Sequence, residues 1–296
     1  MGDRRRETLL RWWRGVKVLG CVGALAVVAS CSVAGGPPAG AATRAPSAPG
    51  SVVAIASTVD GKGYWLATSA GGVQGYGDAR FYGSERGHSI IGAVVALAAT
   101  PDGKGYWLAT TKGAVYSFGD AHFYGSAVKI KLNQPIVGMS TTRDGKGYWL
   151  VASDGGIFTF GDAAFHGSAG AIKLRKPIVG MATMPSGAGY WLVASDGGIF
   201  TFPPNGPFYG STGAMHLSEP VVAMASPPSG KGYWLVESNA AVFTFGAAPI
   251  LGTDQGRNLS HPVVAIAASP SGKGYWLVSG NGTVYPAGSA RTYAAG

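Results

Sequence analysis

Cysteine is almost absent from this sequence, and charged residues are scarce. The two cysteines, Cys21 and Cys31, both lie near the N-terminus, so disulfide bonds cannot hold the rest of the chain together. Charged residues make up 12% of the 296 residues, whereas there are 49 glycines. Little charge combined with much glycine is typical of many short β-strands joined by tight turns, in a chain long enough to bury a substantial core.

The motifs of common enzymes and metal sites are lacking as well. No serine has the G-x-S-x-G spacing of a nucleophile elbow. A metal site needs clustered ligands, and the histidines occupy unrelated positions in the sequence. They are His88, His122, His166, His216 and His261. We therefore predict no catalytic residue, no metal site and no cofactor.

The positive charge is concentrated at the N-terminus. The net charge is +9, of which residues 1–17 alone supply +4, leaving +5 for the remainder. So mild an excess of positive charge does not indicate a nucleic-acid partner.

No apolar run in this N-terminal region is long enough to cross a membrane comfortably. The run Val18–Ser30 contains 13 uncharged, mostly apolar residues and follows the basic residues 1–17. This layout is typical of a secretory signal peptide. The segment 31–51 is rich in glycine, proline and alanine, so we predict a flexible tether there.

The apolar run ends in Val28-Ala29-Ser30-Cys31, which resembles the lipobox of bacterial lipoproteins. The resemblance implies that Cys31 is diacylated and becomes the new N-terminus after residues 1–30 are removed. We therefore expect the protein on the outer face of the cell membrane, held there by a lipid anchor. The alternatives are cleavage after Ala41 or Ala42, which would release a secreted protein, and retention of the apolar run as an anchor.

A Tyr-Trp pair recurs six times in the rest of the chain. The tyrosines lie 42 or 43 residues apart, and such a regular period indicates a repeat architecture. The pairs are Tyr64-Trp65, Tyr106-Trp107, Tyr148-Trp149, Tyr190-Trp191, Tyr233-Trp234 and Tyr275-Trp276.

Within each repeat, apolar residues alternate with a period of two, which indicates strands. In the third repeat we predict strands at 136–140, at the Tyr148-Trp149 segment and at 157–160, with a short fourth strand where Phe123-Tyr124-Gly125 stands in the second repeat. Asp154-Gly155 is a typical hairpin turn. Small residues on the first strand suit the crowded centre of a ring, and the aromatic residues suit the wider gaps between neighbouring blades.

Four antiparallel strands in about 40–45 residues are the dimensions of a propeller blade. We therefore predict an all-β, six-bladed β-propeller of four-stranded blades over 52–296, in preference to an open solenoid such as a β-helix. The expected blades are 52–93, 94–135, 136–177, 178–220, 221–262 and 263–296. The ring would close by packing of the last blade against the first, or by a strand shared between the termini.

The motif GYWLVASDGGIFTFGDA, best preserved at 147–163, resembles a repeat common in secreted actinobacterial proteins. There the repeat is often fused to cell-wall or carbohydrate-active domains. The resemblance covers residues 52–296 and implies a propeller-like fold in an exported protein, without implying a catalytic residue.

One face of such a ring carries the turns after the first and third strands, and we call it the turn face. Asp60, Asp102 and Asp144 recur there beside glycine, as do Asp78, Asp120 and Asp162, and we interpret them as turn-capping residues rather than a binding or catalytic pair. Lysines recur on the same face as a solvated rim or as a ring that grips an anionic polymer. These lysines are Lys62, Lys104, Lys146, Lys231 and Lys273.

The opposite face, which we call the loop face, carries the turns after the second strands and the long loops between repeats. Because binding residues usually lie on variable loops held by a rigid scaffold, this face is the predicted contact surface. Its candidate ligand-binding residues are Lys112, Lys129, Lys131, Lys173, Arg175 and Lys176, unless they serve only solubility.

Three functions fit these features. The first is a monomeric, non-catalytic binding module that displays the loop face to a glycan, wall polymer or protein of the cell envelope. The second is a hydrolase that cleaves carbohydrates or esters at the mouth of the central channel. The third is a structural spacer. We favour the binding module, because the repeats are regular and no catalytic constellation is present.

Overall fold

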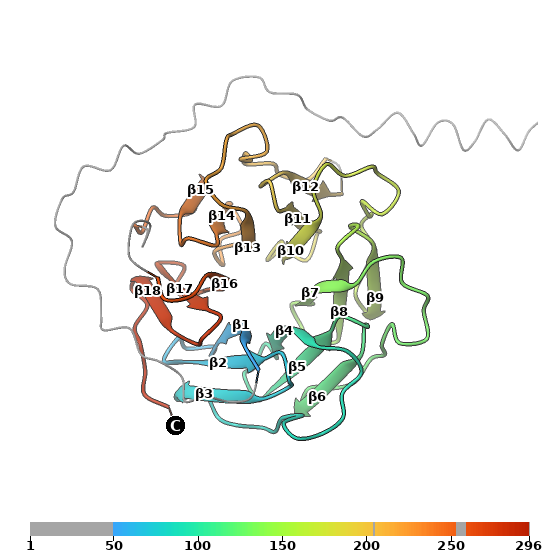
Figure 1. Cartoon of the computed structure of the whole chain (residues 1–296), viewed down its shortest axis with the longest axis vertical. Coiled ribbons are helices and arrows are strands. Elements are labelled where there is room, and N and C mark those ends of the chain that lie inside the picture. The colour runs from blue at the N-terminus through green and yellow to red at the C-terminus, as the bar shows by residue number, and fades with distance from the viewer. Residues whose placement is uncertain (1–49, 204, 253–258, 296) are drawn as a thin grey trace, which may run out of the picture.

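The computed structural model describes residues 50–203, 205–252 and 259–295. These residues form six antiparallel sheets of three strands each, arranged as blades around a central axis (Figure 1). The predicted six-bladed, all-β ring is therefore confirmed. The predicted signal segment, with Cys31, and nearly all of the predicted tether lie outside the described residues.

In every blade the chain runs from the axis outward. The innermost strands are β1 (Val52–Ser57), β4 (Val94–Ala99), β7 (Ile136–Thr141), β10 (Ile178–Thr183), β13 (Val221–Ala225) and β16 (Val263–Ala268). The middle strands are β2 (Gly63–Thr68), β5 (Gly105–Thr110), β8 (Gly147–Ala152), β11 (Tyr190–Ala194), β14 (Gly232–Glu237) and β17 (Gly274–Ser279). The outer strands are β3 (Val73–Gly77), β6 (Val115–Gly119), β9 (Ile157–Gly161), β12 (Ile199–Phe202), β15 (Val242–Gly246) and β18 (Val284–Gly288).

The Tyr-Trp pair of each middle strand joins its blade to both neighbours. Successive side chains of a strand point to opposite faces of the sheet, so the tyrosine contacts the preceding blade and the tryptophan the following one. Trp107 lies 5.9 Å from the ring of Tyr148 in the next blade, and Trp149 lies 5.9 Å from Tyr190. Both faces of the middle strand are thereby buried, and Trp107, Tyr148 and Tyr190 are 0% exposed.

The hydrophobic core is accordingly divided into six clusters, and each cluster lies between two neighbouring blades. Burying one large aromatic side chain removes roughly 150–250 Å² from water, which stabilises the fold by about 4–6 kcal/mol. The interpretation of the Tyr-Trp pairs as the core between blades is confirmed.

The predicted fourth strand is wrong: among the described residues each sheet ends at its third strand. The residues expected to form it, such as 121–126, run along the rim as what we call the outer segment. Hydrogen bonds from side chains hold this segment, in place of the backbone hydrogen bonds that a fourth strand would form with the third. Trp107 Nε1 donates to His122 O at 2.8 Å from the same blade, and the Tyr148 hydroxyl donates to Gly125 O at 2.5 Å from the next blade. Gly125 has φ +135°, which breaks the extended conformation that a ladder requires.

The sixth and first blades close the ring through contacts of the same kind as those between the first and second blades. Val52 N donates to Gly280 O at 2.9 Å, as Val94 N donates to Ser69 O at 2.9 Å between the first two blades. The rings of Tyr64 and Trp276 lie 5.9 Å apart. The C-terminal end lies beside β3 (Figure 1), where Gly77 N donates to Ala294 O in a single bridge. Closure therefore rests on packing of the sixth blade against the first, as the first of our two alternatives predicted.

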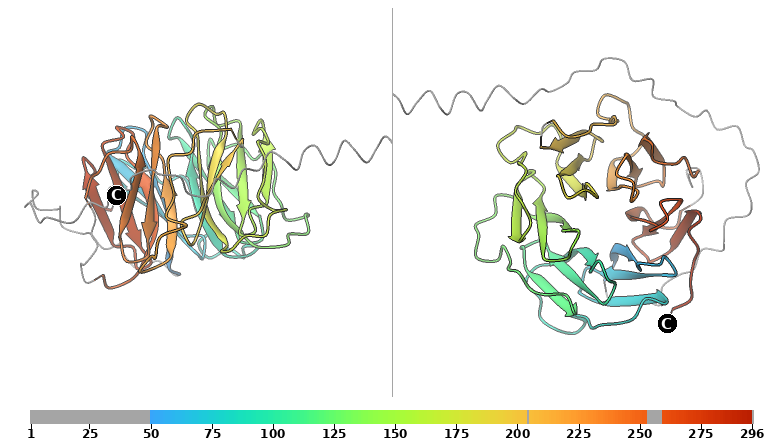
Figure 2. Two further views of the ribbon diagram at one scale, coloured as in Figure 1. Left: turned by 90° about the horizontal axis from the view of Figure 1, so that it is seen from above. Right: turned by 180° about the vertical axis from the view of Figure 1, so that it is seen from behind.

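The turns and loops gather on the two opposite faces of the disc (Figure 2). On the loop face, Ala127 N of a long loop donates to Gly113 O of the turn after β5 at 2.8 Å. On the turn face, Asp120 N after β6 donates to Lys104 O after β4 at 3.2 Å. These bonds place the elements on the two faces as the sequence predicted.

Two tyrosine variants test whether the interface that closes the ring is as well formed as an internal interface. The Tyr293 hydroxyl donates to Gly61 O at 2.8 Å across the closing interface, and the Tyr124 hydroxyl donates to Gly145 O at 3.1 Å across an internal one. Tyr293→Phe and Tyr124→Phe should each cost about 1 kcal/mol, because a partly buried carbonyl loses its donor. Thermal denaturation should show a fall of about 2–4 °C in Tm for each variant. A neutral Tyr293→Phe beside a destabilising Tyr124→Phe would mean that the ring is open in solution.

Candidate functional site

The six cationic residues predicted on the loop face are all exposed: Lys112, Lys129, Lys131, Lys173, Arg175 and Lys176. None of them forms an ion pair with a described carboxylate. Lys129 and Lys131 lie on the loop after the second blade, and Lys173, Arg175 and Lys176 lie on the equivalent loop after the third blade.

Hydrogen bonds hold these loops against the body of the ring. Ala127 and Ala169 are 0% exposed, and their amides donate to Gly113 O at 2.8 Å and Gly155 O at 3.0 Å. Because Lys112 precedes Gly113, the first of these bonds brings Lys112 to the same corner as the loop of Lys129 and Lys131. The structure thus places the six residues on one face of neighbouring blades. Two exposed apolar side chains lie among them, Val128 at 40% exposure and Ile130 at 45%.

The turn face is different, because three of its lysines are paired. Lys62 Nζ lies 3.1 Å from Asp60, Lys104 Nζ lies 3.4 Å from Asp102, and Lys146 Nζ lies 3.5 Å from Asp144. In the fifth and sixth blades, serine replaces the aspartate beside Lys231 and Lys273. Three of the five lysines on this face are therefore paired with an aspartate of their own turn.

The aspartates after the innermost strands cap their turns, as predicted. Asp60 Oδ1 accepts from Lys62 N at 3.0 Å and from the Thr58 hydroxyl at 3.0 Å. The backbone N–H of Lys62 is the main cause that lowers the pKa of Asp60 to about 2. The pKa of Asp102 is also lowered to about 2, mainly by the hydroxyl of Thr100.

Each of the first two blades pairs this aspartate with the one after its outer strand. The carboxyl groups of Asp60 and Asp78 lie close enough to hydrogen-bond, as do those of Asp102 and Asp120. Partial burial, followed by this neighbouring carboxyl, raises the pKa of Asp120. Each pair thus links the turn after the innermost strand to the turn after the outer strand of the same blade.

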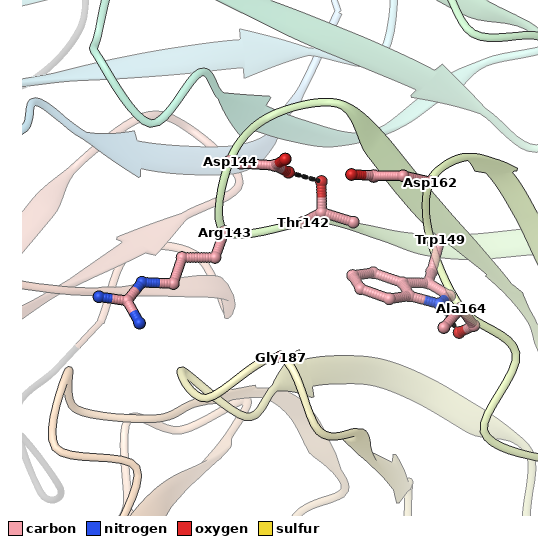
Figure 3. Close-up of a pocket in the computed structure, with 7 residues that line it drawn as sticks. All are labelled: Thr142, Arg143, Asp144, Trp149, Asp162, Ala164 and Gly187. Atoms are coloured by element: carbon pink, nitrogen blue, oxygen red, sulfur yellow. Dashed lines mark hydrogen bonds between the residues drawn. The ribbon is translucent and has the colours of Figure 1, made fainter.

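A cavity lies on the turn face between the third and fourth blades (Figure 3), and the sequence did not predict it. Its volume is about 420 Å³. It is lined by Thr142, Arg143, Asp144, Trp149, Asp162, Ala164 and Gly187. Sequence reasoning had singled out three members of this lining. It treated Asp144 and Asp162 as turn-capping residues and Trp149 as part of the core between blades.

Sequence reasoning also missed a band of exposed apolar side chains around the rim. The outer segments of five blades contribute one each: Phe81 at 58% exposure, Phe123 at 52%, Phe165 at 62%, Phe208 at 50% and Ile250 at 73%. Each precedes the residue that packs inward. The strict alternation of the segment, with one side chain inward and the next outward, was the available signal.

The described residues contain neither a cluster of metal ligands nor a membrane-spanning helix. No group of three potential metal-ligating side chains occurs among residues 50–203, 205–252 and 259–295. Those ranges also contain no helix of the length and hydropathy that a membrane crossing requires.

This fold defines the class of the protein as a β-propeller. The chain is similar to the β-propeller domain of Cps50 (Swd1) from Myceliophteria thermophila, with a TM-score of 0.57 and 12% sequence identity. The similarity covers 85% of this chain and 99% of that domain. At this identity the similarity shows the fold alone. No protein-family model matches the sequence, and no curated protein matches it either.

The lowered pKa values predict how the capping aspartates respond to acid. A carboxyl whose pKa is lower in the folded state stabilises the fold above its unfolded pKa, and this contribution is lost as the pH falls through the folded pKa. Asp60→Asn together with Asp102→Asn keeps the capping oxygens but removes both charges. The double variant should have a lower Tm than the native protein above pH about 4, and the difference should vanish near pH 2. A difference in Tm that stays constant from pH 6 to pH 2 would contradict this assignment.

Proposed function

We propose that this protein is an exported, lipid-anchored β-propeller that acts as a non-catalytic binding module at the cell envelope. The observation that carries the proposal is the contrast between its two faces. The six cationic side chains of the loop face are exposed and form no ion pair with a described carboxylate, whereas three lysines of the turn face are paired within their own turns.

A cluster of unpaired cations on adjacent loops favours an anionic partner. These lysine and arginine side chains lie on adjacent loops of the loop face, so their electrostatic potentials add and attract negative charge. An anionic wall polymer or glycan, or an acidic protein surface, would meet this requirement. Such binding would weaken as salt is added, because exposed charges are screened over about 8–10 Å at physiological ionic strength.

The sequence supports the cellular address. The basic segment 1–17, the short apolar run and Cys31 have the order of a lipoprotein signal, and residues 31–51 would tether the ring to the anchor. The resemblance of the repeat to secreted actinobacterial proteins supports export as well.

The hydrolase alternative has less support. An inverting glycosidase needs two carboxyl groups about 6.5–9.5 Å apart, with room for water between them. Asp60 with Asp78, and Asp102 with Asp120, are instead in hydrogen-bonding proximity. Asp144 is held by Lys146 at 3.5 Å and by the Thr142 hydroxyl at 3.0 Å. These contacts suit structural roles in turns.

The loop face is tested by removing its charge in a variant that has no lipid anchor. In a Cys31→Ser background, a variant carrying Lys129→Ser, Lys131→Ser, Lys173→Ser, Arg175→Ser and Lys176→Ser should lose at least tenfold in affinity for purified cell walls. The reason is the loss of five unpaired positive charges from one surface. Co-sedimentation at 50 and 200 mM salt measures the affinity and its salt dependence.

The turn face offers a matched control with the same change in net charge. Replacing Lys62, Lys104, Lys146, Lys231 and Lys273 by serine in the same background should leave wall binding within twofold of the parent. Equal losses in both variants would show a non-specific effect of net charge. Unchanged binding of the loop-face variant would remove that face as the contact surface.

The anchor is tested separately by Cys31→Ser alone. Without the thiol no lipid can be attached, so the variant should move from the membrane fraction to the medium or the soluble wall fraction. Immunoblotting of washed membranes measures this. A variant that stays in the membrane fraction after a high-salt wash would contradict lipidation at Cys31.

A further inference from the structure

The contact between the third and fourth blades departs from the pattern of the other five. In those five, the second residue of the turn after the innermost strand covers the turn glycine of the next blade. A Cβ placed on Gly145 would lie 2.7 Å from Pro101, and one placed on Gly103 would lie 3.0 Å from Val59. The remaining pairs are Gly230 with Pro185, Gly272 with Pro228 and Gly61 with Pro270.

At the third blade this covering residue is Arg143. A Cβ placed on Gly187, its counterpart in the fourth blade, would meet nothing within 4 Å. Arg143 therefore does not fill the space that valine or proline fills elsewhere. Thr142 beside it is partly exposed, whereas its equivalents Thr58 and Thr100 are both only 7% exposed.

A second departure at the same interface removes a hydrogen bond. In four blades a tyrosine of the outer segment donates its hydroxyl to the next turn glycine: Tyr82 to Gly103, Tyr124 to Gly145, Tyr209 to Gly230 and Tyr293 to Gly61. The third blade has His166 at this position, and its shorter side chain does not bond to Gly187 O. The His166 Nε2 atom is buried and has no partner among the described residues.

The cavity of about 420 Å³ lies at this interface, and Arg143 and Gly187 are among the residues that line it. Small-molecule sites span roughly 300–1,000 Å³, so its size suits a small ligand. Asp144 and Asp162 lie on one side of the opening and Gly187 on the opposite side, with Trp149 at one end and Arg143 at the other (Figure 3). Trp149 is 3% exposed, the highest value among the six tryptophans of the middle strands.

The free groups in the cavity define the chemistry of its ligand. Arg143 and Asp162 form no ion pair with any described residue, and Asp144 is already paired with Lys146. A guanidinium only donates hydrogen bonds, while a carboxylate and the Gly187 carbonyl only accept them. Because the charges oppose each other, the cavity does not favour a strongly charged ligand. Hydroxyl groups both donate and accept, so a ring of hydroxyls satisfies all three groups at once.

We propose that the cleft between the third and fourth blades binds one sugar residue of a glycan through Arg143, Asp162 and Gly187 O. Ala164 and Thr142, which line the cavity beside Trp149, would supply apolar surface for the C–H groups of a sugar ring. This site lies on the turn face, opposite the cationic loops, and is independent of the proposed loop-face contact.

Binding is measured on the full chain by saturation-transfer NMR and isothermal titration. The probes are glucose, galactose, mannose, arabinose and N-acetylglucosamine, each at up to 10 mM, with glycine and glycylglycine as zwitterionic comparisons. At least one sugar should bind, and the zwitterions should not. The proposal is overturned if no sugar gives saturation transfer, or if only the zwitterions do.

The deciding variant restores the regular interface. Arg143→Pro with His166→Tyr should close the cleft, lower sugar affinity at least tenfold and leave Tm unchanged or raised, because both residues occur at these positions in other blades. Asp162→Asn gives a milder test and should lower affinity at least threefold. Its matched control is Asp78→Asn, the same position in the first blade, which should bind like the native protein.

Unchanged sugar affinity in the double variant and in Asp162→Asn would place the sugar elsewhere and overturn the assignment. The loop-face serine variant should bind the sugar as the native protein does. That result would show that sugar binding in the cleft does not depend on the loop face, so each of the two proposals can be refuted without affecting the other.

Discussion

The ring depends on a pair of adjacent aromatic side chains that reach in opposite directions. A strand presents consecutive residues to opposite faces, so a Tyr-Trp dipeptide in the middle of a sheet touches both neighbouring blades. The polar ends of the same side chains bind the rim. Trp149 Nε1 donates to Ala164 O at 2.8 Å in its own blade, and the Tyr190 hydroxyl donates to Gly167 O at 2.5 Å in the blade before. Apolar burial and hydrogen bonding to the outer segment are thus supplied by the same two residues.

This double role explains both the success and the failure of sequence reasoning about the fold. The period of 42 residues and the Tyr-Trp pairs predicted the number of blades and the location of the core, because both follow from local alternation. The fourth strand was wrong, because Phe123-Tyr124-Gly125 has the alternation of a strand but gives its carbonyl groups to side chains instead. Local pattern does not reveal that Tyr148, in the next repeat, takes the place of a strand partner.

The cleft was hidden for a related reason. Arg143 in place of proline and His166 in place of tyrosine are visible when the repeats are aligned. Taken singly, each looks like a tolerated change in an exposed turn or segment. Their meaning appears only when the equivalent residues of other blades are known to contact the turn glycine of the following repeat. Gly187 therefore lacks both the covering side chain and the hydrogen bond from a tyrosine that Gly145 has. The cationic loops, in contrast, were found from sequence, because long side chains on loops remain at the surface whatever the details of packing.

The interface that closes the ring has the same contacts as the first internal one, but it connects a much longer stretch of chain. The bond from Tyr82 to Gly103 spans 21 residues, whereas the bond from Tyr293 to Gly61 spans 232. The entropy of closing a loop grows by roughly 0.6 kcal/mol for each doubling of length, so the last interface costs about 2 kcal/mol more than the others. The junction of the sixth and first blades is therefore the last to form and the first to separate. Local opening of the ring should begin there, beside the strand through which the chain enters the fold.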